Sequence, residues 1–253
     1  MLLLFFRFIF FLLITLVLLP FQVITKIFIK KYSYIIPFYF HSICRWVFGI
    51  KIKVFGIVSM NNPKLSVSNH ASYLDIMILG SLFQTSFVAK KEVSSWPLIG
   101  ILAYLQNTVF VDRKISSIKH QENKIINHLK EKKNLVIFPE GTSSDGNKVL
   151  PFKSSLFNIF TENKNSKIII QTITIVYKKI NNQLIDRSER QKVTWHSDMS
   201  LLSSVLNVLS KKSIEVEVFF DKEFIPNNLN RKKISLLCWK KINYNLNKSL
   251  LKK

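Results

Sequence analysis

A chain of 253 residues can bury one substantial hydrophobic core, which is the size expected of a single α/β domain. Because 21% of the residues are charged against 48% hydrophobic, most of the chain does not have the composition of a polytopic membrane protein. The 37 Lys and Arg residues outnumber the 15 Asp and Glu residues and give a formal net charge of +22, so the composition predicts an anionic partner, either nucleic acid or an acidic lipid surface.

The N-terminal segment favours the lipid surface. Residues 2–19 are apolar except for Arg7 and Thr15, and a helix crosses the hydrocarbon core of a bilayer with about 20 apolar residues. A cleaved signal peptide is the alternative, but no small-residue cleavage site follows the segment. We therefore expect residues 1–31 to be a retained membrane anchor, which either spans the bilayer or lies in one leaflet.

Basic residues follow this anchor and predict its orientation. By the positive-inside rule they place the rest of the chain on the cytoplasmic face of the membrane. They are Lys26, Lys30, Lys31 and Arg45. Residues 32–50 form a second apolar and aromatic stretch, which fits a membrane-proximal amphipathic segment.

The two cysteines, Cys44 and Cys238, lie far apart in apolar settings, so we expect reduced packing residues and no disulfide or metal site.

After residue 50, short β-branched runs alternate with amphipathic runs. The predicted strands are 51–58, 65–68, 87–89, 108–111, 135–138, 167–177 and 213–221. The predicted helices are 73–83, 116–132, 152–162, 201–211 and a basic tail from Arg231. This alternation predicts an α/β fold, with a largely parallel central sheet flanked by helices and an N-terminal membrane-anchoring helix. We divide the remaining chain into one domain, 51–222, and a basic C-terminal tail, 223–253.

The first polar motif, NHASYLD at 69–75, directly follows an apolar strand. His70 at a strand end is placed where α/β folds carry functional groups, and imidazole takes up and releases protons near physiological pH. Asp75 in the first turn of the next helix would accept a hydrogen bond from the ring and stabilise the imidazolium. The alternative is structural: Asn69 and Ser72 cap a helix, and His70 is an ordinary core or surface residue.

Two further strand ends carry polar groups. FPEGTSS at 138–144 follows an apolar strand, and its Pro and Gly predict a turn whose backbone amides and Thr142 hydroxyl can cradle an anion. VFVDR at 109–113 ends in Arg113, whose planar guanidinium suits phosphate or carboxylate. Each segment alone is as well explained by an ordinary loop or a solvated charge. Together they predict one rim of one sheet that carries complementary chemistry.

These motifs resemble a known family. NHASYLD is similar to the N-H-x-x-x-x-D block of the 1-acylglycerol-3-phosphate O-acyltransferases and their glycerolipid acyltransferase relatives. VFVDR and FPEGTSS resemble the second and third blocks, in the family's order and at similar spacing, and the segment 90–113 resembles the stretch that links the first two blocks. The resemblance covers roughly residues 50 to 220.

The resemblance implies a membrane-bound O-acyltransferase of lipid biosynthesis with His70 as general base and Asp75 as its partner. It implies that Arg113, Glu140, Gly141 and Thr142 help to bind the lysolipid head group. The acyl donor is then acyl-CoA or acyl-carrier protein, and no other cofactor and no metal are expected. The leading acceptor is 1-acylglycerol 3-phosphate, which would give phosphatidic acid for phospholipid synthesis.

Two departures bear on the acceptor. Ser143 stands where the family block usually carries arginine, and 170–173 lacks the proline of the fourth block. The stretch 138–156 looks like a branch of the family in which some members acylate lyso-ornithine lipid, and WHSDM at 195–199 resembles that branch's W-Y-G-D-M. Lyso-ornithine lipid is therefore the alternative acceptor, and His196, which replaces a tyrosine, is expected to be structural.

A protein of a different class remains as a rival: a non-catalytic, basic, membrane-anchored binding protein. Lysine runs such as 130–133, 211–212 and 240–241 suit that idea. They also suit a solvated face held against anionic headgroups, at about 1 kcal/mol per near-surface cation. The sequence contains no recognisable zinc finger or aromatic RNA-binding block, so we expect a membrane with anionic lipids and no nucleic acid as partner.

Overall fold

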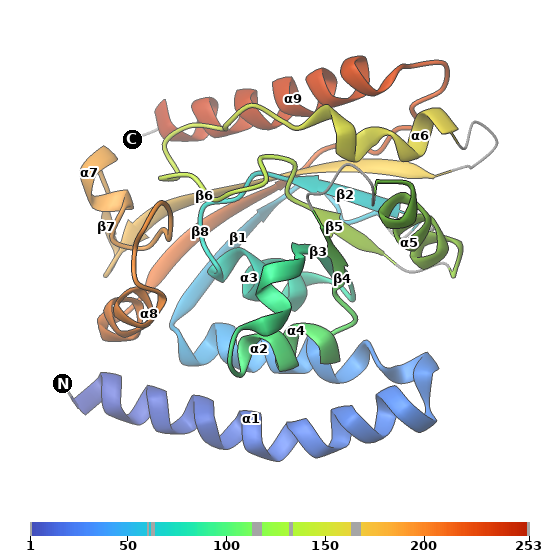
Figure 1. Ribbon diagram of the computed structural model, residues 1–253. Coiled ribbons are helices and arrows are strands. Elements are labelled where there is room, and N and C mark those ends of the chain that lie inside the picture. Colours follow the sequence, from blue (N-terminus) through green and yellow to red (C-terminus); the bar gives the residue numbers. More distant parts are fainter. Residues whose placement is uncertain are drawn as a thin grey trace.

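A computed structural model describes residues 2–59, 61, 64–112, 118–131, 134–162 and 168–251. Figure 1 shows a twisted central sheet with helices on both faces and a long N-terminal helix along one side of the molecule. The helices are α1 Leu2–Phe28, α2 Ile35–Val47, α3 Leu74–Leu82, α4 Ile99–Leu105, α5 Ile118–Lys130, α6 Ile159–Glu162, α7 Arg187–Arg190, α8 Leu201–Ser210 and α9 Arg231–Leu251. Short 3-10 turns occur at η1 Lys30–Tyr32, η2 Lys91–Ser95 and η4 Ser154–Phe157.

The sheet is mixed but largely parallel, as predicted. Its strands are β1 Ile50–Phe55, β2 Lys64–Ser68, β3 Ser86–Lys90, β4 Val109–Val111, β5 Leu135–Ile137, β6 Ile169–Ile180, β7 Gln183–Leu184 and β8 Ile214–Phe220. They are ordered β1-β8-β6-β2-β5-β3-β4, with β7 paired to β6. The β6–β8 and β6–β7 pairs are antiparallel and the other pairs are parallel. Strand β2 lies near the middle and is buried throughout.

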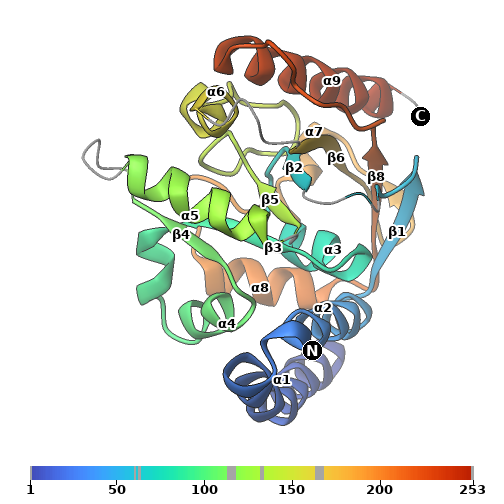
Figure 2. The ribbon, with the colours of Figure 1, turned by 90° about the vertical axis from the view of Figure 1, so that its right-hand side faces the viewer.

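Two hydrophobic clusters cover the two faces of this sheet (Figure 2). Neighbouring side chains of a strand point to opposite faces, so Val136 joins one cluster and Ile137 the other. The first cluster packs the sheet against α2, α3 and α8, and the second packs it against α5, η4 and α9. In α5, which lies within the predicted helix 116–132, the side chains of Ile125, Ile126 and Leu129 are buried.

Helix α9, which the sequence assigned to a basic tail, belongs to the second cluster. Its side chains Ile234, Cys238, Ile242 and Leu246 are fully buried at a spacing of four, as one face of a helix requires. Cys238 and Cys44 are both free and buried. Helix α9 lies on the opposite side of the sheet from α1 and α2, as Figures 1 and 2 both show.

Helix α1 is long and apolar enough to cross a membrane, but polar side chains along it bind the folded domain. Arg7 donates to the backbone carbonyls of Leu209 and Lys212, 3.3 and 3.1 Å away. Near the other end, the buried Gln22 amide donates to the carbonyls of Ser33 (2.9 Å) and Leu105 (2.6 Å). The helix therefore lies lengthwise against the domain.

The other side of α1 is apolar and exposed. Its exposed residues include Phe5, Phe6, Leu13, Leu16, Val17, Phe21 and Phe28. A set of exposed apolar side chains along one helix is a marker of a membrane or protein interaction surface.

The segment 181–197, for which the sequence predicted neither helix nor strand, contains β7 and α7. Asp186 caps α7 by accepting from the Glu189 amide, while the Glu189 side chain accepts from the Asp186 amide. The stretch between β3 and β4 holds η2 and α4, which the sequence analysis did not identify.

Candidate active site

The first motif brings His70 and Asp75 into contact, as predicted. Strand β2 ends at Ser68, the chain turns through 69–73, and Asp75 lies in the first turn of α3. This turn places the His70 Nδ1 atom 2.8 Å from the Asp75 Oδ2 atom. Because a carboxylate only accepts, Nδ1 carries the hydrogen and the other ring nitrogen, Nε2, is left as a base.

The Asp75 carboxylate is fully buried and held by a set of donors. Its Oδ2 atom also accepts from the backbone amides of Ala71 (2.7 Å) and Ser72 (2.9 Å). Its Oδ1 atom accepts from the Tyr177 hydroxyl at 2.6 Å. Burial and the adjacent Asp75 charge raise the pKa of Tyr177 well above its ordinary value, so the phenol stays a donor. These contacts fix the carboxylate that orients the imidazole.

The His70 ring is positioned from a second side by the FPEGTSS segment. The Phe138 ring stacks on the imidazole, with centroids 4.2 Å apart and planes inclined by 22°. His70 Nε2 makes no hydrogen bond to any of the described residues. The His70 side chain is 19% exposed and lines a cavity with largely apolar walls. The free base therefore faces the space in which a substrate would lie.

Glu140 links the two motifs through the backbone. Its Oε1 atom accepts from the His70 amide (2.7 Å) and its Oε2 atom from the Leu150 amide (2.8 Å). Burial raises the pKa of Glu140 to about 8, against the lowering effect of these two amides. Since the side chain is only 3% exposed and both oxygens have backbone partners, its contacts are those of a positioning residue. The head-group role that the resemblance implies for Glu140 stays a prediction.

Of the other three residues predicted to bind the head group, two line the cavity and one lies outside the described residues. Gly141 and Thr142 line the cavity together with His70. Gly141 has a φ of 67°, in the left-handed region that favours glycine. Arg113 lies outside the described residues, which end at Asp112 in this part of the chain.

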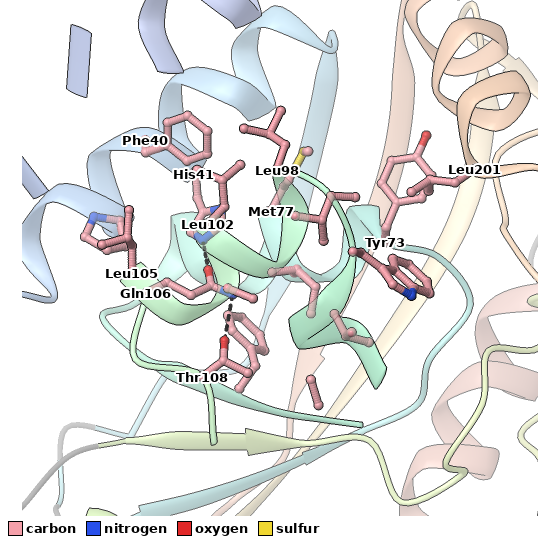
Figure 3. Close-up of a pocket in the computed structure, with 18 of the residues that line it drawn as sticks. Phe40, His41, Tyr73, Met77, Leu98, Leu102, Leu105, Gln106, Thr108 and Leu201 are labelled. Carbon is pink, nitrogen blue, oxygen red and sulfur yellow. Dashed lines mark hydrogen bonds between the residues drawn. The ribbon is translucent and has the colours of Figure 1, made fainter. Parts of the chain in front are cut away.

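The cavity beside His70 has a volume of about 720 Å³ and is walled largely by apolar side chains. Helices α1, α2, α3 and α4 supply about half of them, and Figure 3 shows Phe40, Met77, Leu98 and Leu102 around this space. A pocket of this size and lining suits the hydrocarbon chain of a lipid. Thr142, Ser143 and Ser197 also line the cavity and provide hydroxyl groups.

Sequence reasoning missed several of these residues. Tyr177 lies in the apolar run of β6 and resembles any core aromatic residue there. Trp96 and Trp195 also line the cavity and meet edge to face, with centroids 5.8 Å apart. No spacing signal connects positions so far apart in sequence.

An apolar cavity that ends at a histidine–aspartate pair is a site suited to acyl transfer, and comparisons with known proteins agree. A model of the family described as Acyltransferase matches residues 51–178, half of the chain. A lyso-ornithine lipid O-acyltransferase of Brucella abortus is 34% identical over 244 residues, which cover 94% of this chain and 91% of that protein. The protein therefore belongs to the acyltransferase family.

Two other proteins with similarity to this chain carry a different name. A 1-acyl-sn-glycerol-3-phosphate acyltransferase of Neisseria gonorrhoeae is 28% identical over 160 residues, covering 63% of this chain and 59% of that protein. The crystal structure of the 1-acyl-sn-glycerophosphate acyltransferase PlsC of Thermotoga maritima matches with a TM-score of 0.64 and 16% identity, over 98% of this chain and 99% of that one. This structural match shows that the two proteins share a fold.

Proposed function

We propose that this acyltransferase moves a fatty acyl group from a thioester donor to the free hydroxyl of lyso-ornithine lipid. The observation that carries the acceptor is the 34% identity to a protein of that name over more than 90% of both chains. Ser143 supports it, because this residue lines the cavity where the glycerol phosphate enzymes usually carry a cation. The donor is acyl-CoA or acyl-carrier protein.

The second candidate acceptor is 1-acylglycerol 3-phosphate, which the motif resemblance placed first. The relatives with that name and the shared fold of PlsC favour it. Both acceptors present a free hydroxyl, so the chemistry at His70 is the same for either.

The geometry supports direct transfer with His70 as general base. Nε2 takes the proton of the acceptor hydroxyl as its oxygen attacks the thioester carbonyl carbon. Asp75 stabilises the imidazolium that forms. The tetrahedral oxyanion then collapses, the carbon–sulfur bond breaks, and the leaving thiolate takes the proton from the imidazolium. The products are the acylated lipid and the free thiol, and His70 returns to its starting state.

The placement of α1 supports a protein that lies on one leaflet. A helix tied to the domain by Arg7 at one end and Gln22 at the other has its apolar side parallel to the domain surface. We propose that this side is buried in the membrane interface, with the domain on the cytoplasmic face. The cavity, which α1 helps to line, then opens close to the lipids that supply the acceptor.

Mass spectrometry of lipids formed by the purified protein tests the proposal. The enzyme is offered lyso-ornithine lipid and 1-acylglycerol 3-phosphate in equal amounts, in detergent micelles, with one acyl thioester. We expect the diacylated ornithine lipid to form faster. Preferential formation of phosphatidic acid would instead show that 1-acylglycerol 3-phosphate is the preferred acceptor. Lipid binding without any acylated product would favour the non-catalytic membrane protein.

A further inference from the structure

Three polar side chains lie together in the apolar wall of the cavity. They are His41 from α2, Gln106 after the end of α4, and Thr108 just before β4, and we call them the polar trio. Figure 3 shows them among Phe40, Leu102 and Leu105. Polar groups in such a wall cost free energy unless they are hydrogen-bonded, so their presence requires an explanation.

The hydrogen bonds within the polar trio leave one strong acceptor without a partner. The Gln106 amide donates to the Thr108 hydroxyl oxygen (3.2 Å), and its carbonyl oxygen lies 2.8 Å from His41 Nε2. With the amide in this orientation, Nε2 carries the hydrogen and donates it. His41 Nδ1 is then an acceptor, and it is buried with no hydrogen-bond partner among the described residues.

The state and position of the His41 ring are both fixed. Burial lowers the pKa of His41 to about 4, so the ring is neutral near physiological pH and Nδ1 keeps its lone pair. The ring packs directly on Gly80 of α3, where a Cβ atom would lie 2.4 Å from its Cδ2 atom. Glycine at this position therefore lets the imidazole pack closely against α3, where it lines the cavity.

We propose that the polar trio binds a hydroxyl group carried on the acyl chain of the donor, so that the enzyme favours hydroxyacyl thioesters over unsubstituted ones. This inference rests on the proposed function, because it takes the cavity to hold the acyl chain. The incoming hydroxyl donates to His41 Nδ1, while Gln106 and Thr108 hold the ring in the tautomer that makes this atom an acceptor.

A hydroxyl fits this place better than a charged group does. The polar trio is neutral as a whole, and its neighbours Phe40, Leu102 and Leu105 give no compensation for a buried charge. A site built around a substrate hydroxyl discriminates strongly against the analogue that lacks it, because its own polar groups are then left unpaired.

The test measures kcat/KM of the purified enzyme with one lysolipid acceptor and chain-matched acyl thioesters, unsubstituted or with a hydroxyl at successive positions. We expect one hydroxyl position to be favoured over the unsubstituted chain by about tenfold or more. In His41→Phe the ratio should fall to about one. Thr108→Val, which keeps His41, should lower the ratio by less, and Met77→Leu, which alters only apolar lining, should keep it.

The outcomes separate this inference from the proposed function. Transfer of all donors with a ratio near one at every hydroxyl position would overturn the inference alone. The inference would also be overturned if both His41→Phe and Thr108→Val kept the preference of the natural protein for the hydroxylated donor. The thermal melting curve of each variant checks that it is folded. Absence of transfer from every donor to every lysolipid would overturn the proposed function, and this inference with it.

Discussion

The Tyr177 hydroxyl and the Asp75 carboxylate, 102 positions apart in sequence, are joined by a buried hydrogen bond of 2.6 Å. Tyr177 lies on β6 and Asp75 at the start of α3, so this bond ties the sheet to the motif that carries His70. Because Oδ2 serves His70 and the two backbone amides while Oδ1 serves Tyr177, the phenol competes with the imidazole for the negative charge of one carboxylate.

Replacing Tyr177 by Phe should slow the reaction and change its pH dependence. The variant loses one donor to Asp75, so the carboxylate is less firmly held and kcat should fall about tenfold. The carboxylate also interacts more strongly with the imidazolium, so the acidic limb of the kcat/KM profile should move to higher pH. A merely structural role would reduce the amount of folded enzyme and leave the profile where it is.

His70→Ala and Asp75→Ala should each remove most of the transfer activity, by about 10²-fold to 10⁴-fold, because the base or its orienting partner is lost. Both variants should still bind lipid vesicles, since α1 is unaltered. Turnover and vesicle co-sedimentation are measured on the same preparations. Near-normal turnover of the His70→Ala protein would refute the assignment of the base.

Glu140→Gln distinguishes positioning from head-group binding. A glutamine offers one acceptor oxygen in place of two, so either the His70 or the Leu150 amide loses its partner. We expect unfolding to require about 1–3 kcal/mol less and kcat to fall about tenfold, with KM for the lysolipid little changed. A large rise in KM at constant kcat would instead support the head-group contact that the family resemblance implies.

Buried His41 should make stability depend on pH. Its pKa is about 4 in the folded protein against an ordinary value of 6.5, so the unfolded chain takes up the proton first as the pH falls. Stability is then lost on going from pH 6.5 towards pH 4, by up to about 3 kcal/mol from this residue. Urea unfolding across that range should show the loss in the natural protein and a smaller loss in His41→Phe. Equal slopes would contradict the buried neutral state.

Gln22→Leu tests the attachment of α1. The substitution removes the amide that donates to Ser33 and Leu105, so two buried carbonyls lose a donor. We expect a loss of about 1–3 kcal/mol in stability and faster hydrogen exchange in the second half of α1. Leu16→Ala on the exposed side is the matched control, which should leave exchange unchanged while weakening vesicle binding. Unaltered exchange in Gln22→Leu would show that apolar packing alone holds the helix.

Sequence periodicity was sufficient to predict the α/β class and the positions of most strands. The His70–Asp75 contact was also predictable, because a strand end followed by a helix start leaves few paths for five residues. The contact between Tyr177 and Asp75 was not predictable. It depends on the pairing of β2 with β6, in which Ser68 lies opposite Ile173. The antiparallel direction of β8 against β6 is likewise absent from hydrophobic periodicity, which is the same for either direction.

Segments with weak local signals account for the remaining differences. Helix α4 is seven residues long and apolar, and a short apolar run does not distinguish helix from strand. Its N-cap residue, Leu98, has a φ of 60°, a conformation that leucine rarely adopts and that no propensity rule predicts. The His41 Nδ1 atom is buried without a hydrogen-bond partner among the described residues. This burial depends on the packing of α2 against α3 and cannot be inferred from either helix alone.

The position of α9 changes how the large positive charge of the chain should be understood. Helix α9, which carries the basic residues Arg231, Lys232, Lys233, Lys240, Lys241 and Lys248, lies across the sheet from α1. At physiological ionic strength the field of such cations is screened within about 8 Å, so in the proposed placement of α1 they contribute little to adhesion at the bilayer. Replacing the cations of α9 should therefore change the salt dependence of membrane binding very little.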